Sequence, residues 1–220
     1  EVITMDPHPE VPDLVFTANA GIVNGHQFVP SHFRHPERQG ETEIDAAWFE
    51  AHGFQVDRLP TELDHEGAGD ALPFTPEGGE TVLVSGYSFR SDAAAITELS
   101  RLLGGPVKAV QLIDPRLYHL DLTFCPLDER HAICAPSGWD SYGRKVIEAL
   151  VPEPLWLEEE EAPGEPAAAH RFSQSLPATF ISAPIRWRSV ESSSRLKVAS
   201  HPPSRTQGGR HASKPVAPAV

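Results

Sequence analysis

The chain has 220 residues, a formal net charge of −13 and two cysteines. The excess of acidic residues argues against a nucleic-acid partner, and no apolar run reaches the length that a membrane span needs. Two cysteines do not make a disulfide framework in a chain of this size, so we expect a reduced, cytoplasmic setting without a signal peptide.

The charge is unevenly distributed along the chain. Between 169 and 220 the only acidic residue is Glu191, against eight lysines and arginines. That segment therefore carries about +7, and residues 1–168 carry about −20. The basic segment is rich in Ser and Pro and has no sustained period, so we expect 1–168 to form one domain and 169–220 a disordered or frame-shifted tail. We also expect a truncated first module, because Glu1 stands in what reads as the end of a strand.

The apolar pattern predicts elements that recur in a fixed order. Expected strands are at 12–23, 27–29, 54–59, 81–87, 107–113, 120–125 and 131–134. Expected helices are at 41–52, 92–103 and 137–150. Asn24-Gly25 is a strong hairpin signal between the first two strands. The order strand, strand, helix, strand repeats at roughly 50-residue spacing, which favours α/β modules around an axis over a doubly wound sheet. Charged residues at each strand end would then gather at the centre.

The segment from His119 to Cys125 combines a strand pattern with an acid/base pair. Apolar and polar residues alternate there, so on a strand His119 and Asp121 would share one face. The alternative is an edge strand with a solvated His and Asp.

A second segment, Glu66-Gly67-Ala68-Gly69-Asp70, places two carboxylates around two glycines. Taken alone, it indicates a calcium-like or merely flexible loop.

Four segments in this order resemble the guanidino-group-modifying enzymes, which include dimethylarginine dimethylaminohydrolases, arginine deiminases and amidinotransferases. They are Pro12-Asp13-Leu14-Val15-Phe16-Thr17-Ala18-Asn19, Glu66-Gly67-Ala68-Gly69-Asp70, Gly86-Tyr87-Ser88-Phe89-Arg90 and Tyr118-His119-Leu120-Asp121. The resemblance covers Val2 to about Glu161. It implies the pentein fold, an α/β propeller of repeated ββαβ modules, which we expect to be incomplete at both ends here.

The resemblance also implies roles for individual residues. Asp13, Asn19 and Asp121 match positions that hold a planar guanidinium. His119 matches the general acid/base, and Glu66 matches the carboxylate that orients it.

Two arginines match positions that grip the α-carboxylate of the substrate in the dimethylarginine-hydrolysing branch. They are Arg38 and Arg90, for which solvated surface arginines are the alternative. Asn19 is informative because arginine deiminases have an aspartate at the matching place, so the amide resembles the arginine dihydrolase branch.

We therefore expect a hydrolase of the C–N bond of a linear amidine, the guanidino group of arginine or a methylated arginine, of dimethylargininase-like type. The alternatives are the arginine dihydrolase, deiminase or amidinotransferase branches, or a non-catalytic guanidinium-binding protein. We expect no cofactor, no metal, and no nucleic-acid or membrane partner. The protein assembly that we consider is a homodimer. A metal site of His119 and Asp121 with some of His8, His26, His32 and His35 fits no standard zinc spacing.

The nucleophile of the family is a cysteine near the end of the chain, after a glycine-rich loop. Gly208-Gly209 stands at about that distance, but no cysteine follows. We hypothesise a frame shift near Ser173 and expect an inactive chain. On a strand, Cys125 would lie about 20 Å from His119, too far to act instead, and we expect Cys134 to be a core residue. The nucleotide sequence of the last quarter, read in three frames, tests this hypothesis.

Overall fold

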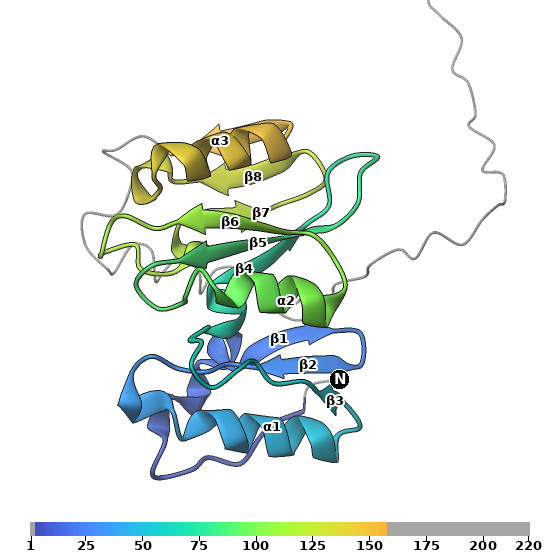
Figure 1. The fold of residues 1–220 in the computed structure, drawn as a ribbon, viewed down its shortest axis with the longest axis vertical. Coiled ribbons are helices and arrows are strands. Elements are labelled where there is room, and N and C mark those ends of the chain that lie inside the picture. Colours follow the sequence, from blue (N-terminus) through green and yellow to red (C-terminus); the bar gives the residue numbers. More distant parts are fainter. Residues whose placement is uncertain (1–2, 158–220) are drawn as a thin grey trace, which may run out of the picture. The chain divides into compact units, whose positions relative to one another are not determined.

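The computed structural model describes residues 3–157, which lie in one compact unit of the chain. The predictions for the tail at 169–220, the frame shift near Ser173 and Gly208-Gly209 fall outside the described residues. Within them, the chain forms three mixed three-stranded sheets, each with one helix (Figure 1).

The first module begins with a hairpin of β1 (Gly21–Asn24) and β2 (Gln27–Pro30). Gly25 in the turn has φ of +61°, as the Asn-Gly signal predicts. Helix α1 (Glu41–Ala51) follows, and β3 (Gln55–Val56) then pairs parallel to β2.

The second module repeats this order. Strands β4 (Ala71–Phe74) and β5 (Val82–Tyr87) are antiparallel, α2 (Ala95–Leu103) ends at Gly104 with φ of +69°, and β6 (Val107–Gln111) is parallel to β5.

The third module repeats it once more. It comprises antiparallel β7 (Phe124–Pro126) and β8 (His131–Cys134), α3 (Ser141–Leu150), and β9 (Glu153–Trp156) parallel to β8. The predicted strand, strand, helix, strand order is present in all three modules, but β4 and β9 were not among the strands expected from the sequence.

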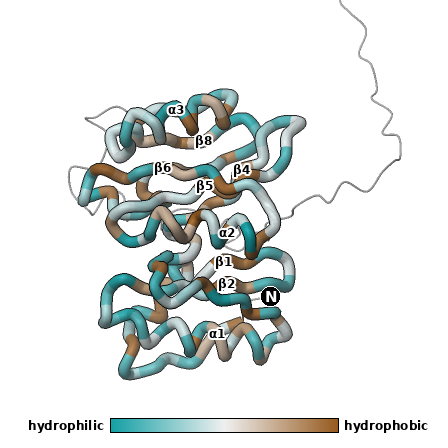
Figure 2. Tube along the Cα trace, in the orientation of Figure 1, coloured by the Kyte–Doolittle hydropathy of each residue, from teal (hydrophilic) through white to brown (hydrophobic). Residues whose placement is uncertain are grey.

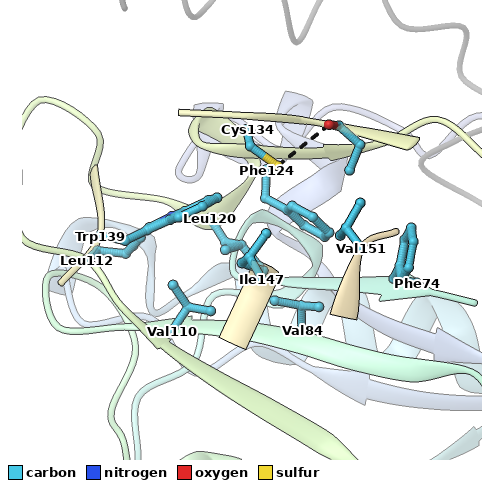
Figure 3. Packing of buried hydrophobic residues seen from close by; sticks show 11 residues of the cluster. Phe74, Val84, Val110, Leu112, Leu120, Phe124, Cys134, Trp139, Ile147 and Val151 are labelled. Carbon is cyan, nitrogen blue, oxygen red and sulfur yellow. Dashed lines mark hydrogen bonds between the residues drawn. The ribbon is translucent and has the colours of Figure 1, made fainter. Parts of the chain in front are cut away.

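Helices α2 and α3 each pack against a neighbouring sheet as well as against the sheet of their own module. One buried cluster joins Leu99 of α2 to Ile22 of β1 and Leu83 of β5, and α2 lies between these two sheets in Figure 1. Figure 3 shows a second cluster, in which Ile147 of α3 packs with Val110 of β6 and Phe124 of β7 among other apolar side chains. Each apolar interface is therefore shared by two modules.

No helix among residues 3–157 is long and apolar enough to cross a bilayer, and the helices in Figure 2 mix hydrophilic with hydrophobic residues.

Short 3₁₀ helices replace two of the predicted strand segments. The strand predicted at 12–23 is wrong before Gly21, because Pro12–Val15 and Thr17–Asn19 are 3₁₀ helices. The strand predicted at 120–125 is wrong over Leu120–Leu122, another 3₁₀ helix, and β7 begins only at Phe124. At 120–122 the alternation gave a false strand signal, because the Leu120 amide donates to Asp70 Oδ1 and the Thr123 amide closes the turn onto the Leu120 carbonyl oxygen.

Two helix details also differ from prediction. The buried residues of α1 are Glu41, Asp45 and Ala46, two of them acidic, whereas the apolar period that predicted this helix would bury its apolar residues. Helix α3 starts at Ser141 because the Asp140 side chain caps it, accepting from the Gly143 amide at 2.7 Å.

Candidate functional site

Three short 3₁₀ helices, one directly before the first strand of each module, form the site. They are Thr17–Asn19 before β1, Gly67–Gly69 before β4, and Leu120–Leu122 before β7. The same hydrogen bond closes each turn, from the amides of Ala20, Asp70 and Thr123 to the carbonyl oxygens of Thr17, Gly67 and Leu120. The turn at 67–69 contacts both of the others, so the repeat brings equivalent chain positions together.

An imidazole between two carboxylates is the centre of this arrangement. His119 Nε2 lies 3.4 Å from Glu66 Oε2, and His119 Nδ1 lies 3.2 Å from Asp70 Oδ1. Glu66 and Asp70 are fully buried, and His119 is 7% exposed. Because these three ionisable groups have almost no contact with solvent, their charges must be balanced by one another.

The charges shift the pKa values of this cluster in opposite directions. Burial alone would lower the pKa of His119, but the negative charges of Asp70, Asp121 and Glu66 outweigh it and raise the pKa. Burial would raise the pKa of Asp70, but the His119 charge and the hydrogen bond from Ser91 lower it. Both shifts favour the charged forms, an imidazolium at His119 and a carboxylate at Asp70.

Two carboxylate oxygens around this imidazolium lack a hydrogen-bond donor. Within residues 3–157, Glu66 Oε1 and Asp121 Oδ1 are buried without a hydrogen-bond partner. Burial raises the pKa of Asp121 to about 6, an effect that His119 opposes and Asp70 reinforces. Unsatisfied buried acceptors are costly, so these two oxygens are candidates for accepting hydrogen bonds from a ligand.

Hydrogen bonds from other turns hold the Glu66–Asp70 loop in place. Ser91 Oγ accepts from the Glu66 amide at 3.1 Å and donates to Asp70 Oδ2 at 2.6 Å, while the Leu120 amide donates to Asp70 Oδ1 at 3.0 Å. Ser91 therefore stabilises this loop, and α2 begins without a side-chain cap.

His65 supports the same loop from within the core. Its Nδ1 accepts from the Gly67 amide at 3.2 Å, so its proton sits on Nε2, 3.4 Å from Ser85 Oγ. Burial, with a smaller effect of the His119 charge, lowers the pKa of His65 to about 4 despite the opposing charge of Asp70.

The glycines of the loop allow the three turns to meet. Gly67 has φ of +61°, and a Cβ there would lie 2.8 Å from the Gly21 nitrogen. A Cβ on Gly69 would lie 2.4 Å from Asn19 Nδ2 and 3.4 Å from His119 Nδ1. The Asn19 amide and the His119 ring thus lie against the same glycine, which places Asn19 beside the ionic centre.

Both predicted carboxylate-gripping arginines are paired with carboxylates of the chain. Arg90 Nη1 donates to Glu66 Oε2 at 3.0 Å, with its guanidinium 4.6 Å from the centre of the Tyr118 ring. Arg38 is 9% exposed and binds Glu41. The alternative of solvated surface arginines is wrong for both.

The remaining predicted site residue, Asp13, lies at the rim. Its carbonyl oxygen accepts from Arg38 Nη2 at 3.4 Å, and its carboxylate contributes to the raised pKa of Arg38. The structure thus brings His119, Glu66, Asn19 and both arginines into one connected network, with Asp121 beside His119 and Asp13 at the edge.

Sequence reasoning assigned no role to Asp70, Ser91, His65 or Glu41. Asp70 is part of the segment Glu66-Gly67-Ala68-Gly69-Asp70, but no role was assigned to it. Its position in the repeat, equivalent to Ala20 and Thr123, is the signal that could have indicated one. Glu41 carried no signal, because a glutamate in the first turn of a helix is ordinary.

Neither cysteine of the sequence is poised as a thiolate. Cys134 is fully buried in β8, where its Sγ lies 3.6 Å from the Ala132 carbonyl oxygen (dashed line in Figure 3), and burial raises its pKa to about 12. Cys125 is 6% exposed in β7, and burial together with the charge of Asp121 raises its pKa. Both are packing residues, as predicted.

No group of three or more His, Cys, Asp or Glu side chains suited to a metal ion occurs in the described part of the chain. His32, one of the histidines considered for such a site, contacts Asp64 at 3.0 Å.

Curated proteins similar to this chain modify guanidino groups. It is 48% identical over 141 residues to the bifunctional arginine dihydrolase/ornithine cyclodeaminase ArgZ of Synechocystis sp., covering 64% of this chain and 20% of ArgZ. It is 36% identical over 151 residues to the N(G),N(G)-dimethylarginine dimethylaminohydrolase of Mycobacterium tuberculosis, covering 69% of this chain and 48% of that enzyme. The chain thus spans less than half the length of either relative. No family model matches it.

Solved structures agree with this similarity. The N-terminal domain of ArgZ, a Cys-to-Ser variant bound to substrate, superposes with a TM-score of 0.66 at 45% identity, covering 71% of this chain and 57% of that one. A dimethylarginine dimethylaminohydrolase adduct with S-methyl-L-thiocitrulline, at 19% identity and a TM-score of 0.56, shares the fold. The chain belongs to the guanidino-group-modifying enzymes, as its four segments indicated. Of the two curated relatives described, the cyanobacterial arginine dihydrolase shares the larger fraction of identical residues.

Proposed function

We propose that this chain binds the guanidino group of free arginine and carries the proton-transfer half of an arginine-dihydrolase-type amidine hydrolase. The observation that carries the proposal is His119 between Glu66 and Asp70, beside two buried carboxylate oxygens without hydrogen-bond partners. A guanidinium is a planar cation with N–H donors in its plane, which is the ligand such acceptors recognise.

Each group then has a distinct part in the chemistry. Glu66 and Asp121 accept hydrogen bonds from the guanidinium, and the Asn19 amide orients it from the neighbouring turn. His119, as an imidazolium, donates its proton to the departing amine and takes a proton from the attacking water later. Asp70 keeps that imidazolium charged and fixes its ring.

The covalent step of the family scheme needs a thiolate that adds to the guanidinium carbon before water releases the intermediate. The two cysteines are both buried with raised pKa values. We therefore expect this sequence to bind arginine without turning it over, which makes a non-catalytic guanidinium-binding protein the second candidate.

Free arginine is favoured over a methylated arginine for two reasons. The relative with 48% identity is named an arginine dihydrolase, whereas the dimethylarginine hydrolase is 36% identical. The amide of Asn19 also matches the dihydrolase branch rather than the aspartate of the deiminases. Methylated arginine is the second ligand to test.

We propose in addition that the three ββαβ modules are consecutive blades of an α/β propeller. The shared packing of α2 and α3 between neighbouring sheets supports this arrangement. We further propose that residues 1–168 belong to this one catalytic domain.

Calorimetry tests the binding proposal. The chain should bind L-arginine, and Glu66→Gln should weaken binding at least tenfold, whereas Glu153→Gln, which alters an exposed ion pair with Arg130, should not. A tighter fit for dimethylarginine would move the assignment to that branch. Absence of binding to both ligands by the folded chain would refute the proposal.

Turnover is measured separately by release of ammonia, citrulline or ornithine. No release from a chain that binds arginine supports the non-catalytic reading. Release that survives replacement of both cysteines by serine would contradict the thiolate scheme.

A further inference from the structure

We propose that Glu41 is a positioning residue of this site: it anchors Arg38, and Arg38 in turn fixes which way the Asn19 amide faces. This inference rests on the proposed guanidinium site and adds a residue outside the four family segments.

The anchor is a buried, bidentate ion pair. Arg38 Nε donates to Glu41 Oε1 at 2.8 Å, and Arg38 Nη2 donates to Glu41 Oε2 at 2.7 Å. Glu41 is 1% exposed, in the first turn of α1, and the Arg38 guanidinium lies 4.3 Å from the centre of the Phe33 ring. Two parallel hydrogen bonds and an aromatic face leave this guanidinium little freedom to turn.

The other side of the guanidinium faces the site. Arg38 Nη1 donates to Asn19 Oδ1 at 3.3 Å. Because arginine is donor only, this contact requires the oxygen of the amide to face Arg38 and its NH₂ group to face the opposite way. Asn19 Nδ2 accordingly donates to the Glu66 carbonyl oxygen at 3.4 Å, beside the loop that carries the ionic centre.

The orientation of this amide has a chemical consequence. Turned by 180°, Asn19 would present an acceptor where it now presents a donor, and it would set its NH₂ group against the Arg38 donors. Glu41 prevents this indirectly, since an Arg38 released from its carboxylate could leave Asn19. Arg38 then acts on the guanidino end of the ligand, whereas the resemblance assigned it to the α-carboxylate.

Two ligands distinguish an effect of Arg38 on the guanidino group from an effect on the α-carboxylate. Agmatine has the guanidino group of arginine but no carboxylate. If Glu41 acts through Asn19, Glu41→Gln should weaken arginine and agmatine binding by the same factor, about tenfold, which corresponds to 1.4 kcal/mol. Weakening confined to arginine would place Arg38 on the carboxylate and overturn the proposal, as would no weakening of either ligand.

The control variant lies two residues further along the same helix. Glu43 is in the first turn of α1 as well, but its exposed side chain pairs with Arg58 at 3.0 Å. Glu43→Gln changes the helix charge as Glu41→Gln does, and it should leave both affinities unchanged.

A double-substitution cycle tests the chain of contacts directly. With Asn19→Ala already in place, Glu41→Gln should cause little further loss of agmatine affinity, because the residue through which it acts is gone. A full, additive loss would show that Glu41 acts elsewhere.

A ligand-free measurement keeps the inference independent of the proposed function. The side-chain amide resonances of Asn19 should shift or broaden in Glu41→Gln and not in Glu43→Gln, while circular dichroism confirms that both variants are folded. Unchanged Asn19 resonances would overturn the inference. If the wild-type chain binds no guanidino ligand, the proposed function fails, and the resonances still decide whether Glu41 orients Asn19.

Discussion

Asp70 offers the sharpest test of the ionic centre, through the substitution Asp70→Asn. Asparagine keeps the shape of the side chain and an acceptor for the Leu120 amide, 3.0 Å away, but it removes the charge that faces His119 at 3.2 Å. Two unit charges at that distance attract by about 5 kcal/mol at an effective dielectric constant near 20. Desolvation offsets part of this attraction, yet breaking a buried pair typically costs about 3–5 kcal/mol because one charge is left alone.

The loss should depend on pH in a defined direction. The pKa of Asp70 is lowered from 3.8 in the fold, so its contribution is present above pH 3.8 and is lost as pH falls through the lower, folded value. The pKa of His119 is raised from 6.5, so its contribution is complete below pH 6.5 and is lost as pH rises through the higher, folded value. Both partners contribute fully between these two reference values, and Asp70→Asn should be most destabilising there.

Urea unfolding followed by tryptophan fluorescence measures this effect. We expect a loss of about 3 kcal/mol in the free energy of unfolding at pH 5.5, and a smaller loss once the pH has risen through the folded pKa of His119. Asp128→Asn, which removes an exposed partner of His131, is the matched control and should leave stability nearly unchanged. A loss below about 1 kcal/mol at pH 5.5 would refute a charged His119–Asp70 pair.

Two other substitutions probe neighbouring features. Burial and the nearby charge of Glu41 raise the pKa of Asp45 from 3.8 to about 7, so the wild-type protein should lose stability as pH rises between these values. Asp45→Asn should flatten that slope in urea unfolding at pH 5 and pH 8, and an unchanged slope would show that Asp45 is ordinarily ionised. Gly69→Ala places a Cβ 2.4 Å from Asn19 Nδ2. Arginine affinity in calorimetry should therefore fall at least tenfold, whereas the melting temperature should change little. Unaltered affinity would show that Asn19 is not part of the binding site.

Local sequence patterns predicted much of the architecture of the chain. Asn24-Gly25 predicted a hairpin because that pair favours the turn that joins twisted strands, and Gly25 has the positive φ that this turn requires. Repetition of these signals predicted the three modules. The resemblance pointed to His119, Glu66, Asn19 and the two arginines, and these residues lie in one network of contacts, while their roles stay a prediction.

The turns that build the site were harder to predict. Residues 119–125 alternate as a strand would, but the fold winds Leu120–Leu122 into a 3₁₀ helix whose first amide donates to Asp70, 50 residues earlier. Glu41 was equally hidden, since a pair with Arg38 inside the core is a property of packing and not of spacing. Long-range hydrogen bonds of this kind leave no local period in a sequence.

The division of the site among three modules also bears on stability. Asn19, Glu66 and His119 come from separate ββαβ units, so a guanidinium held by all three would tie these units together much as a cross-link does. Ligand that binds only the assembled form shifts unfolding by mass action, and saturating arginine should therefore slow amide hydrogen exchange in β1, β4 and β7 at once. Ligand binding and the cohesion of the three modules would then depend on the same few contacts.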